Sequence, residues 1–410
     1  MTAIKTIAII IPNLGPGGAQ QVFRAQIRFL RDVYHVLPVV FNRSGMTDQD
    51  QSLNCYFLDV PAGKTAFGKA FNFVLRILKF RLFKKRNKVD LSISHLEGAD
   101  YVNILSGISR TIIWVHGSKT HDRKIGGTLG WLRKRIMIPW LYGRSDTIVT
   151  VSKGLQDELT NDFSLPVEKI CVVHNGLRIG DIEALASGAL PDRYVPVFRD
   201  HFVIVTHCRF AAQKNLESLI AIIGSLKDQI KIRWVILGDG ELRNALIDQC
   251  AGIGVKIHTV WQSKDPAYDE TVYFPGYIEQ PYTFLKNASL YIMTSAWEGY
   301  PLSLIEALAC KLPVMSSDCY TGPAEIIGIR EGESAKTYPY YGLCGVLMPV
   351  IEGPNDKERV ELWRNEILAL SSNLRIIAEF RLAAANCARG FSDHMSNEKT
   401  LAVVESMSYI

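Results

Sequence analysis

The chain has 410 residues, of which 48% are hydrophobic and 21% are charged, and its formal net charge at pH 7 is +5. A chain of this length exceeds what one hydrophobic core usually organises, so it predicts two domains with ample core. The composition excludes long disordered or low-complexity regions, and the small positive charge gives no reason to expect a nucleic-acid partner.

The eight cysteines stand singly, without a CxxC pair or a His/Cys cluster at metal-ligand spacing. This pattern predicts reduced thiols in a cytoplasmic protein and no metal site. The apolar run from Thr6 to Ile11 is short and lacks a basic flank, so it is interpreted as a strand and not as a signal peptide. No apolar stretch reaches the roughly 18 residues that a membrane span needs, so any membrane contact is expected to be peripheral.

In the first half, short β-branched runs alternate with helical patterns such as Gly18 to Asp32. This alternation predicts βαβ units and a parallel sheet. The expected strands are Thr6 to Ile11, Val36 to Phe41, Leu91 to Ser94, Thr111 to Val115, Thr147 to Val151 and Ile170 to His174.

A second series of strands predicts a second parallel-sheet domain; its members are Phe202 to Thr206, Ile232 to Leu237, Val272 to Phe274, Leu290 to Thr294 and Pro313 to Ser316. The stretch from Ala184 to Asp200 is expected to be a linker because it holds prolines and few periodic apolar residues. We therefore predict domains at 1–195 and 196–375, followed by helices over 376–410 that break near Gly390 and pack toward the first domain. The polar segment from His258 to Thr271 is expected to be a surface loop.

A glycine-rich loop, Pro12 to Ala19, leads from the first strand directly into a helix. Gly17 and Gly18 would let backbone N–H groups approach a ligand, and the helix N-terminus favours an anion. The spacing is neither GxGxxG nor a Walker loop, which weakens a dinucleotide or P-loop interpretation. A tight turn that needs glycine for geometry alone explains the loop equally well.

Two cations follow the first strand of the second half, with Arg209 at the strand end and Lys214 near the start of the next helix. Their charges would add to the helix dipole and would suit a diphosphate. The alternative is that both side chains are simply solvated.

The segment from Thr294 to Cys310 carries two carboxylates, Glu298 in a loop and Glu306 in the second turn of a helix that starts near Pro301. Glu306 stands in an otherwise apolar segment and must therefore be hydrogen-bonded. A carboxylate accepts two hydrogen bonds at once, so vicinal sugar or ribose hydroxyls match it well. The alternative is a glutamate that pairs with a core arginine or caps a turn.

The pattern Glu298-Gly299-Tyr300-Pro301-Leu302-Ser303-Leu304-Ile305-Glu306 resembles the signature of the retaining glycosyltransferases of family four, which have the GT-B fold. The resemblance extends along the chain in the expected order. The further segments that carry it are Gly17 to Gln20, Val151 to Lys153, His174 to Leu177, Arg209 with Lys214, Leu237 to Arg243, Phe274 to Tyr277 and Gly322 to Ile327. It implies an α/β protein with two Rossmann-like parallel-sheet domains facing a cleft, an acceptor-binding domain followed by a donor-binding domain.

The resemblance also implies roles for individual residues. Arg209 and Lys214 would bind the donor diphosphate, Glu298 the transferred sugar, and Glu306 the ribose. Gly17 and Gly18 would face the phosphates from the first domain. His116 matches the catalytic histidine, although a structural histidine explains it as well and His95 is a weaker competitor. The implied catalytic set is Glu298, His116, Lys214 and Arg209, and the donor-binding set adds Gly17, Gly18, Gly299, Tyr300, Leu302 and Glu306.

The implied reaction is the retaining transfer of a hexosyl or N-acetylhexosaminyl group from a nucleoside diphosphate sugar, with UDP favoured over GDP. No cofactor and no metal ion is expected, because cations and helix N-termini would stabilise the leaving diphosphate. The alternatives are a GT-B sugar-nucleotide epimerase and a scaffold that binds a nucleotide sugar without turnover.

The basic segments bear on the acceptor. From Lys64 to Lys88 there are nine basic residues and no acidic one, and the range from Phe71 to Arg86 mixes them with apolar residues as an interfacial helix does. The range from Leu129 to Trp140 is similar. Both segments predict contact with anionic lipid, and the alternative is two surface helices packed on the sheet. With the resemblance, this favours a lipid-linked glycan or lipopolysaccharide acceptor at the cytoplasmic face of the inner membrane.

Overall fold

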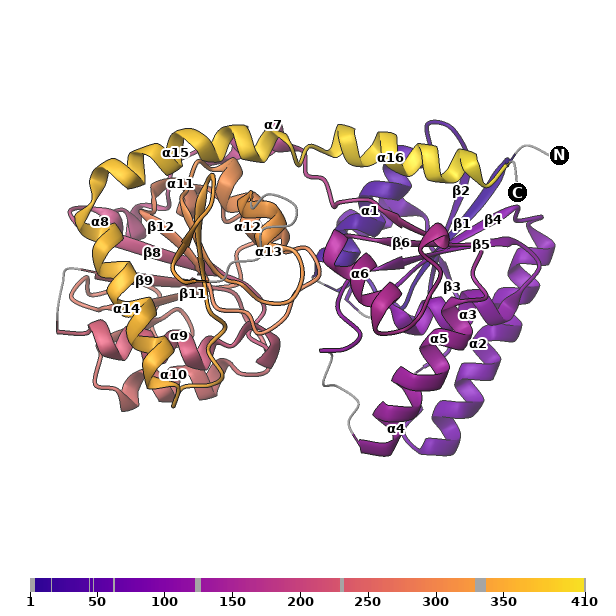
Figure 1. Cartoon of the computed structure of the whole chain (residues 1–410), viewed down its shortest axis with the longest axis horizontal. Helices are drawn as coiled ribbons and strands as arrows, with labels where there is room; N and C mark the ends of the chain where they lie inside the picture. Colours follow the sequence, from indigo (N-terminus) through magenta and orange to yellow (C-terminus); the bar gives the residue numbers. More distant parts are fainter. Residues whose placement is uncertain are drawn as a thin grey trace. The chain divides into compact units, whose positions relative to one another are not determined.

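The structure is a computed structural model that describes residues 4–15, 17–43, 45–46, 48–61, 63–121, 127–228, 232–328 and 337–408. The chain forms two compact units, Met1–Gly176 with His394–Ile410 and Leu177–Asp393. Each unit is an α/β sheet with helices on both faces (Figure 1). Pro16, within the predicted glycine-rich loop, lies outside the described residues.

The first unit has a seven-stranded parallel sheet in the order β3-β2-β1-β4-β5-β6-β7. Six of the strands confirm the predictions, and β3 was missed because it has only two residues. The strands are β1 (Thr6–Ile11), β2 (His35–Val40), β3 (Tyr56–Phe57), β4 (Leu91–His95), β5 (Arg110–Val115), β6 (Thr147–Thr150) and β7 (Ile170–Val172).

Burial on both faces explains why these strands are continuous apolar runs. In β1 every residue after Thr6 is buried, and α1 covers the sheet with Phe23, Ile27 and Leu30. The helices of the unit are α1 (Gly18–Leu30), α2 (Ala66–Arg86), α3 (Glu97–Ser106), α4 (Gly127–Leu132), the π-helical η2 (Arg133–Met137), α5 (Ile138–Tyr142), α6 (Lys153–Asn161) and α16 (Asp393–Ser406).

The second unit has an eight-stranded sheet in the order β10-β11-β9-β8-β12-β13-β15-β14, parallel except for the pairing of β14 with β15. Its strands are β8 (Phe202–His207), β9 (Ile232–Leu237), β10 (Ile257–Thr259), β11 (Val272–Gly276), β12 (Leu290–Met293), β13 (Val314–Ser317), β14 (Tyr340–Tyr341) and β15 (Gly345–Met348). Its main helices are α7 (Ile179–Ala186), α9 (Leu216–Leu226), α10 (Arg243–Gly252), α11 (Tyr282–Asn287), α12 (Leu302–Ala309), α13 (Pro323–Ile327), α14 (Lys357–Ser372) and α15 (Leu374–Arg389).

Two predictions for the second unit need correction. The segment from His258 to Thr271 is not a loop from its start, because His258 and Thr259 belong to β10, which pairs with β11. The buried strand β15 was missed, and its first residue shows why glycine is needed there. A Cβ atom on Gly345 would lie 2.3 Å from the carbonyl oxygen of Val314 in the neighbouring strand.

The predicted linker from Ala184 to Asp200 lies wholly within the second unit. It contains the end of α7, the 3-10 helix η4 (Asp192–Tyr194) and α8 (Val195–Phe198). Tyr194 is buried, with its ring centre 5.2 Å from that of Phe284, and α7 packs on α11 and α12. These few contacts fix the stretch to the second unit. The division falls after Gly176 instead of near residue 195. The assignment of acceptor and donor to the two parts stays a prediction.

The C-terminal helices break where the sequence predicts, between α15 and α16. They are shared between the units, because α15 belongs to the second and His394–Ile410 to the first. Within the first unit, the hydroxyl of Thr147 at the start of β6 lies 3.3 Å from the sulfur of Met407.

Candidate active site

The candidate site of the second unit lies at the carboxyl ends of β8 and β12, which are neighbours in the sheet. Ligands of open parallel sheets bind at this edge, because the loops that follow the strands meet there. The loop after β8 leads to Lys214, and the loop after β12 leads to Glu298 and into α12. The fold thus brings together two segments about 85 residues apart in the sequence.

Lys214 and Glu298 form a close ion pair, with 2.5 Å between Nζ and Oε1. The same carboxylate oxygen accepts a hydrogen bond of 2.7 Å from the hydroxyl of Ser295, and the other oxygen lies 3.4 Å from Nε2 of Gln213. Burial disfavours the charged lysine, but the charge and hydrogen bond of Glu298, together with Cys208 and Cys319, outweigh it and raise the pKa of Lys214. Lys214 therefore stays a cation although it is largely shielded from solvent.

Backbone hydrogen bonds hold the Glu298 loop in place. The N–H of Ala296 donates to the carbonyl of Gln213 at 2.9 Å, so the two loops are tied directly to each other. The hydroxyl of Thr321 donates to the carbonyls of Glu298 and Gly299 at 2.8 and 3.1 Å. The carboxylate is thus presented by a loop with little freedom to move, as a positioned ligand group requires.

Glu306 meets a partner that the sequence interpretation missed, His207, the last residue of β8. Nε2 of His207 lies 2.6 Å from Oε2 of Glu306, and both side chains are mostly buried. The hydroxyl of Tyr291 donates to the carbonyl of His207 at 3.2 Å. Within the described part of the chain, Nδ1 of His207 has no hydrogen-bond partner. The one signal in the sequence was the position of this histidine at the end of a central strand.

The other predicted donor residues are placed differently. Arg209 is exposed and pairs with Glu241 at 3.1 Å, so it is not part of the Lys214 pair. Tyr300 and Leu302 are buried, and the Tyr300 ring packs edge-on against Phe391. Their side chains serve the core of the second unit. Because both side chains are buried, a ligand near the start of α12 would contact backbone N–H groups and not the side chains of Tyr300 and Leu302.

In the first unit, Gly17 and Gly18 stand where the glycine-rich loop enters α1. The loop is braced by Arg24, whose NH2 group donates to the carbonyl of Leu14 at 2.6 Å while Nε pairs with Asp50 at 2.6 Å. The first N–H groups of a helix are unpaired within it, so this end offers donors to an anion.

The histidine expected to be catalytic, His116, follows β5 and forms a chain with His95 and Gln26. Nε2 of His116 lies 2.8 Å from Nδ1 of His95, and Nε2 of His95 lies 2.9 Å from the Gln26 side-chain oxygen. The amide oxygen can only accept, so His95 donates to it and accepts from His116. This pattern leaves Nδ1 as the lone-pair nitrogen of a neutral His116. Burial lowers the pKa of His116 to about 3, and burial beside His116 holds that of His95 well below 6.5.

A charged cluster that the sequence interpretation missed lies near the carboxyl ends of β4 and β5. Glu97 contacts Arg133 and lies 3.4 Å from Nζ of Lys119. Burial opposes ionisation of Glu97, but the hydrogen bond from Arg133 and the charge of Lys119 lower its pKa to about 2. Asp100 is buried beside Ser94 and Tyr142, and burial raises its pKa to about 7.

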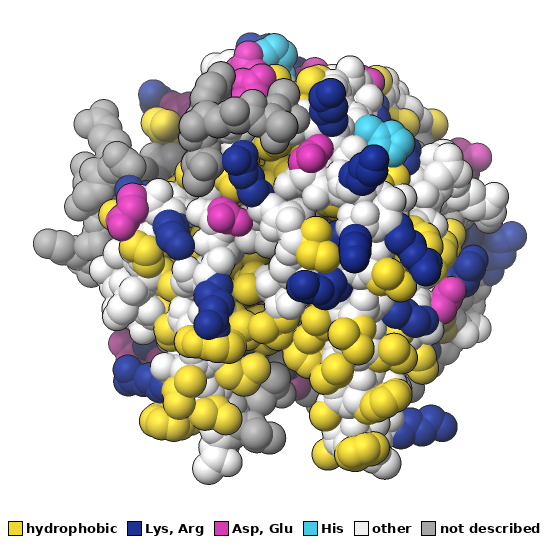
Figure 2. All heavy atoms as spheres, turned by 90° about the vertical axis from the view of Figure 1, so that its right-hand side faces the viewer, with side chains coloured by type: hydrophobic (Ala, Val, Ile, Leu, Met, Phe, Trp, Pro, Cys, Tyr) yellow, Lys and Arg dark blue, Asp and Glu magenta, His cyan; other side chains and the backbone are white. Residues whose placement is uncertain are grey.

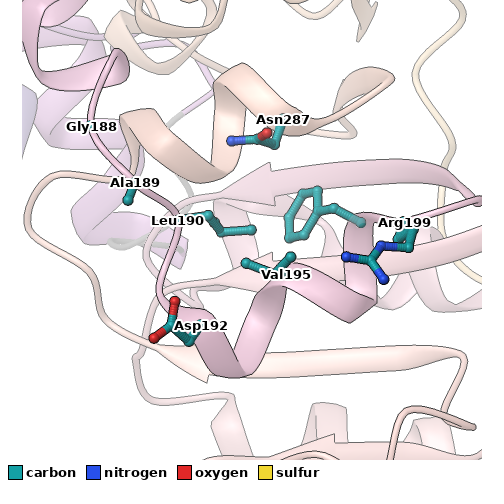
Figure 3. A pocket seen from close by; sticks show the side chains of 8 residues that line it. Gly188, Ala189, Leu190, Asp192, Val195, Arg199 and Asn287 are labelled. Carbon is teal, nitrogen blue, oxygen red and sulfur yellow. The ribbon is translucent and has the colours of Figure 1, made fainter.

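One pocket in the second unit lies apart from these groups (Figure 3). Its lining runs from Gly188 to Arg199, before β8, and includes Asn287, before β12. These residues belong to the amino ends of the strands, opposite the edge that holds Lys214 and Glu298. The pocket is therefore not part of the candidate active site.

Within the ranges that the structure describes, no three His, Cys, Asp or Glu side chains lie together as metal ligands would. Metal independence of the reaction stays a prediction. Among the same residues, no helix is both long and apolar enough to cross a bilayer.

Two α/β domains with parallel sheets form the architecture of the GT-B type, and the second carries a lysine–glutamate pair and a histidine–glutamate pair at its carboxyl edge. Two family models match the chain, Glycosyltransferase Family 4 over residues 16–180 and Glycosyl transferases group 1 over residues 195–338. The chain therefore belongs to the GT-B glycosyltransferases that these two models describe, and the two parallel-sheet α/β domains expected from the sequence are confirmed.

Known proteins resemble the chain over most of its length. It is 29% identical over 292 residues to an uncharacterized glycosyltransferase of Methanocaldococcus jannaschii, covering 68% of each chain. It is 24% identical over 332 residues to the N-acetylgalactosamine-N,N'-diacetylbacillosaminyl-diphospho-undecaprenol 4-alpha-N-acetylgalactosaminyltransferase of Campylobacter jejuni, covering 80% of this chain and 85% of the relative. The crystal structure of Anabaena HepE in complex with UDP has the same fold, with a TM-score of 0.73, 16% identity and coverage of 98% and 100%.

Proposed function

We propose that this enzyme transfers a hexosyl or N-acetylhexosaminyl group from a nucleoside diphosphate sugar, with retention, to a lipid-linked glycan in cell-surface polysaccharide or lipopolysaccharide assembly. The observation that carries the proposal is the Lys214–Glu298 pair, with 2.5 Å between Nζ and Oε1, at the edge where Glu306 meets His207. A cation and two carboxylates match the three parts of such a donor, which are the diphosphate, the sugar and the ribose.

Each group has a chemical task in the transfer. The bond between the anomeric carbon and the diphosphate oxygen breaks, and negative charge grows on the leaving nucleoside diphosphate. Lys214 stabilises that charge, because the buried cation is already in place and needs no reorganisation. Glu298 accepts hydrogen bonds from the sugar hydroxyls and Glu306 from the ribose. The acceptor hydroxyl attacks from the face that the diphosphate leaves, and its proton passes to the leaving diphosphate oxygen as the new glycosidic bond forms.

Two relatives support the choice of substrates. The Campylobacter jejuni enzyme acts, by its name, on a diphospho-undecaprenol-linked sugar, so a lipid-linked acceptor is the first to test. Anabaena HepE was solved with UDP bound, which favours UDP over GDP as the donor nucleotide.

The test combines donor binding with turnover. A panel of UDP and GDP sugars is screened for an increase in the melting temperature of the whole protein, since a donor at 100 times its dissociation constant adds about 2.7 kcal/mol. The donor that stabilises the protein is then incubated with and without a lipid-diphosphate-linked sugar. We expect nucleoside diphosphate release that depends on the acceptor. Binding without release would indicate a scaffold, and conversion of the sugar without an acceptor would indicate an epimerase; either result overturns the proposal.

A further inference from the structure

Helix α2 (Ala66–Arg86) has an apolar stripe that faces solvent. Its members recur at spacings of three and four residues, which places them on one side of the helix, and each is at least 46% exposed. The stripe consists of Phe67, Phe71, Val74, Leu78 and Leu82.

The other side of α2 is already committed to the core of the first unit. Phe80 and Phe83 are buried against the sheet, and Phe73 and Ile77 pack against the same cluster. The helix is therefore apolar on two sides, while an ordinary surface helix is apolar on one. Packing on the sheet explains why the inner side of α2 is apolar. It gives no reason for the apolar residues of the outer stripe.

A second exposed apolar surface follows β5. The consecutive elements α4, η2 and α5 expose Trp131 at 61% and Trp140 at 55%, and the Arg144 guanidinium lies 3.8 Å from the centre of the Trp140 ring. The other exposed apolar side chains of this stretch are Leu132, Ile136 and Met137; the side chain of Leu129 lies outside the described residues. Tryptophan rings favour the boundary between hydrocarbon and water.

These two surfaces point to the same end of the first unit (Figure 2), where hydrophobic side chains gather in a continuous region with a band of Lys and Arg beside it. Helix α3 packs against both α2 and α5 and so joins them. We call the α2 stripe together with the exposed residues of α4 to α5 the apolar face. Contiguous exposed apolar surface of this kind marks an interaction site.

The structure distinguishes cations that can reach a partner from those that cannot. Lys84 is buried, with Nζ 2.9 Å from the side-chain oxygen of Asn103, so it is not available to lipid as the sequence suggested. Arg81 donates to the carbonyl of Ser106, and Lys79 to that of Leu58. The exposed basic residues that remain near the apolar face are Lys64, Lys69, Lys85, Arg86, Lys88, Arg135 and Arg144.

We propose that the apolar face docks on an anionic lipid bilayer, with the α2 stripe and the two tryptophans in the interface and the neighbouring cations on the headgroups. The combination of apolar centre and basic rim is what interfacial helices use. A second copy of the chain is a poorer occupant. In a symmetric pair the same patch meets itself, so the basic rims would be brought together and would repel each other.

The position of the apolar face in the fold indicates what docking would achieve. This step rests on the proposed function. Helix α2 begins after β3 ends and α4 follows β5, so both elements start on the side of the sheet where the strands have their carboxyl ends. His116 lies on this same side of the first unit. An acceptor anchored in the bilayer would thus meet the unit at the edge that carries its candidate histidine.

The test measures binding of the whole protein to vesicles without any sugar donor, so it does not depend on turnover. Vesicles of equal parts phosphatidylglycerol and phosphatidylcholine are compared with pure phosphatidylcholine in a flotation assay. We expect binding to the anionic vesicles that weakens with salt. The double variant Phe71→Ser/Leu78→Ser should lower the partition coefficient at least about tenfold, because both side chains leave the hydrocarbon boundary. The variant Lys85→Gln/Arg86→Gln should lower it about tenfold as well.

The matched control is Leu374→Ser/Leu382→Ser on α15 of the second unit, where both leucines are as exposed as the α2 stripe. It should bind vesicles like the unchanged protein. The fluorescence of bound protein should shift to the blue, and Trp131→Phe should reduce that shift. Equal binding by the stripe variant and the unchanged protein would overturn the proposal. So would a change of oligomeric state in the stripe variant without a change in vesicle binding, which would make the face an interface between copies.

Discussion

The residues expected to be catalytic at the carboxyl edges of the two sheets differ in charge. In the second unit, a buried lysine is paired with Glu298 and its pKa is raised. In the first unit, His116 and His95 lie within hydrogen-bond distance of each other, His95 donates to the neutral amide of Gln26, and the pKa values of both histidines are lowered. The expected catalytic groups are thus a paired cation in the second unit and neutral imidazoles in the first, where Glu97, Arg133 and Lys119 carry the charges of the same edge.

The difference shows that a carboxylate neighbour can outweigh burial, which otherwise disfavours the charged form. Burial works against the charged form in both places. Lys214 keeps its proton because a carboxylate lies beside it, whereas His116 has another imidazole as its neighbour and Lys119 as a nearby cation. A permanent cation suits a leaving diphosphate, and a neutral ring suits a hydrogen bond with a hydroxyl.

The largest expected effect comes from removing the cation. Lys214→Met should lower kcat/KM about 10²- to 10³-fold, as the loss of one positioned donor to a developing anion does. It also leaves Glu298 without its cation, so the melting temperature should fall. The double variant Lys214→Met/Glu298→Gln should recover stability without recovering activity. Steady-state kinetics and thermal unfolding of the three proteins check both expectations.

Lys357→Met is the matched control, because this lysine is exposed at the start of α14. It should change neither activity nor stability. Normal turnover in Lys214→Met would remove Lys214 from the catalytic set and with it the contrast between the two units.

The sequence predicts the sheets better than the junction between the units. Long, buried β-branched runs such as Ile232–Leu237 are strong signals, because strands covered on both faces are continuously apolar. The junction was misplaced because Tyr194 and its neighbours hold the stretch before β8 by a few long-range contacts, which periodicity does not reveal. The same holds for the two-residue strand β3.

The site was predicted residue by residue, but its pairings were not. Lys214 and Glu298 were both expected at a donor site, yet their contact joins segments that only the sheet order brings together. His207 was overlooked because a single histidine at a strand end has no spacing pattern. Arg209, expected beside Lys214, pairs instead with Glu241 on another loop. A sequence pattern predicts which residues take part, and the topology shows which of them touch.

A smaller effect is expected from His207, which we infer to be a positioning residue that orients Glu306. His207→Leu should raise the KM for the donor about tenfold and change kcat little, because one hydrogen bond to a charged group is lost. His207→Gln, whose amide nitrogen can still donate to Glu306, should restore most of the affinity. An equal fall of kcat and of kcat/KM in both variants would indicate a role in the transition state and contradict the positioning role.

The last prediction concerns the neutral His116 and is tested through folding stability instead of activity. Because burial lowers the pKa of His116 to about 3, the unfolded chain takes up its proton near pH 6.5 while the folded chain does not. Folding stability should therefore fall as the pH drops from 6.5 toward 3, with a contribution from His116 that approaches about 1.4 kcal/mol per pH unit. Urea unfolding at several pH values should show a shallower acid slope in His116→Asn, while His35→Asn, whose ring is exposed at the start of β2, should keep the slope of the unchanged protein. An identical slope in His116→Asn would mean that His116 takes up a proton as readily in the folded chain as in the unfolded one. The contrast between a charged Lys214 and a neutral His116 would then no longer hold.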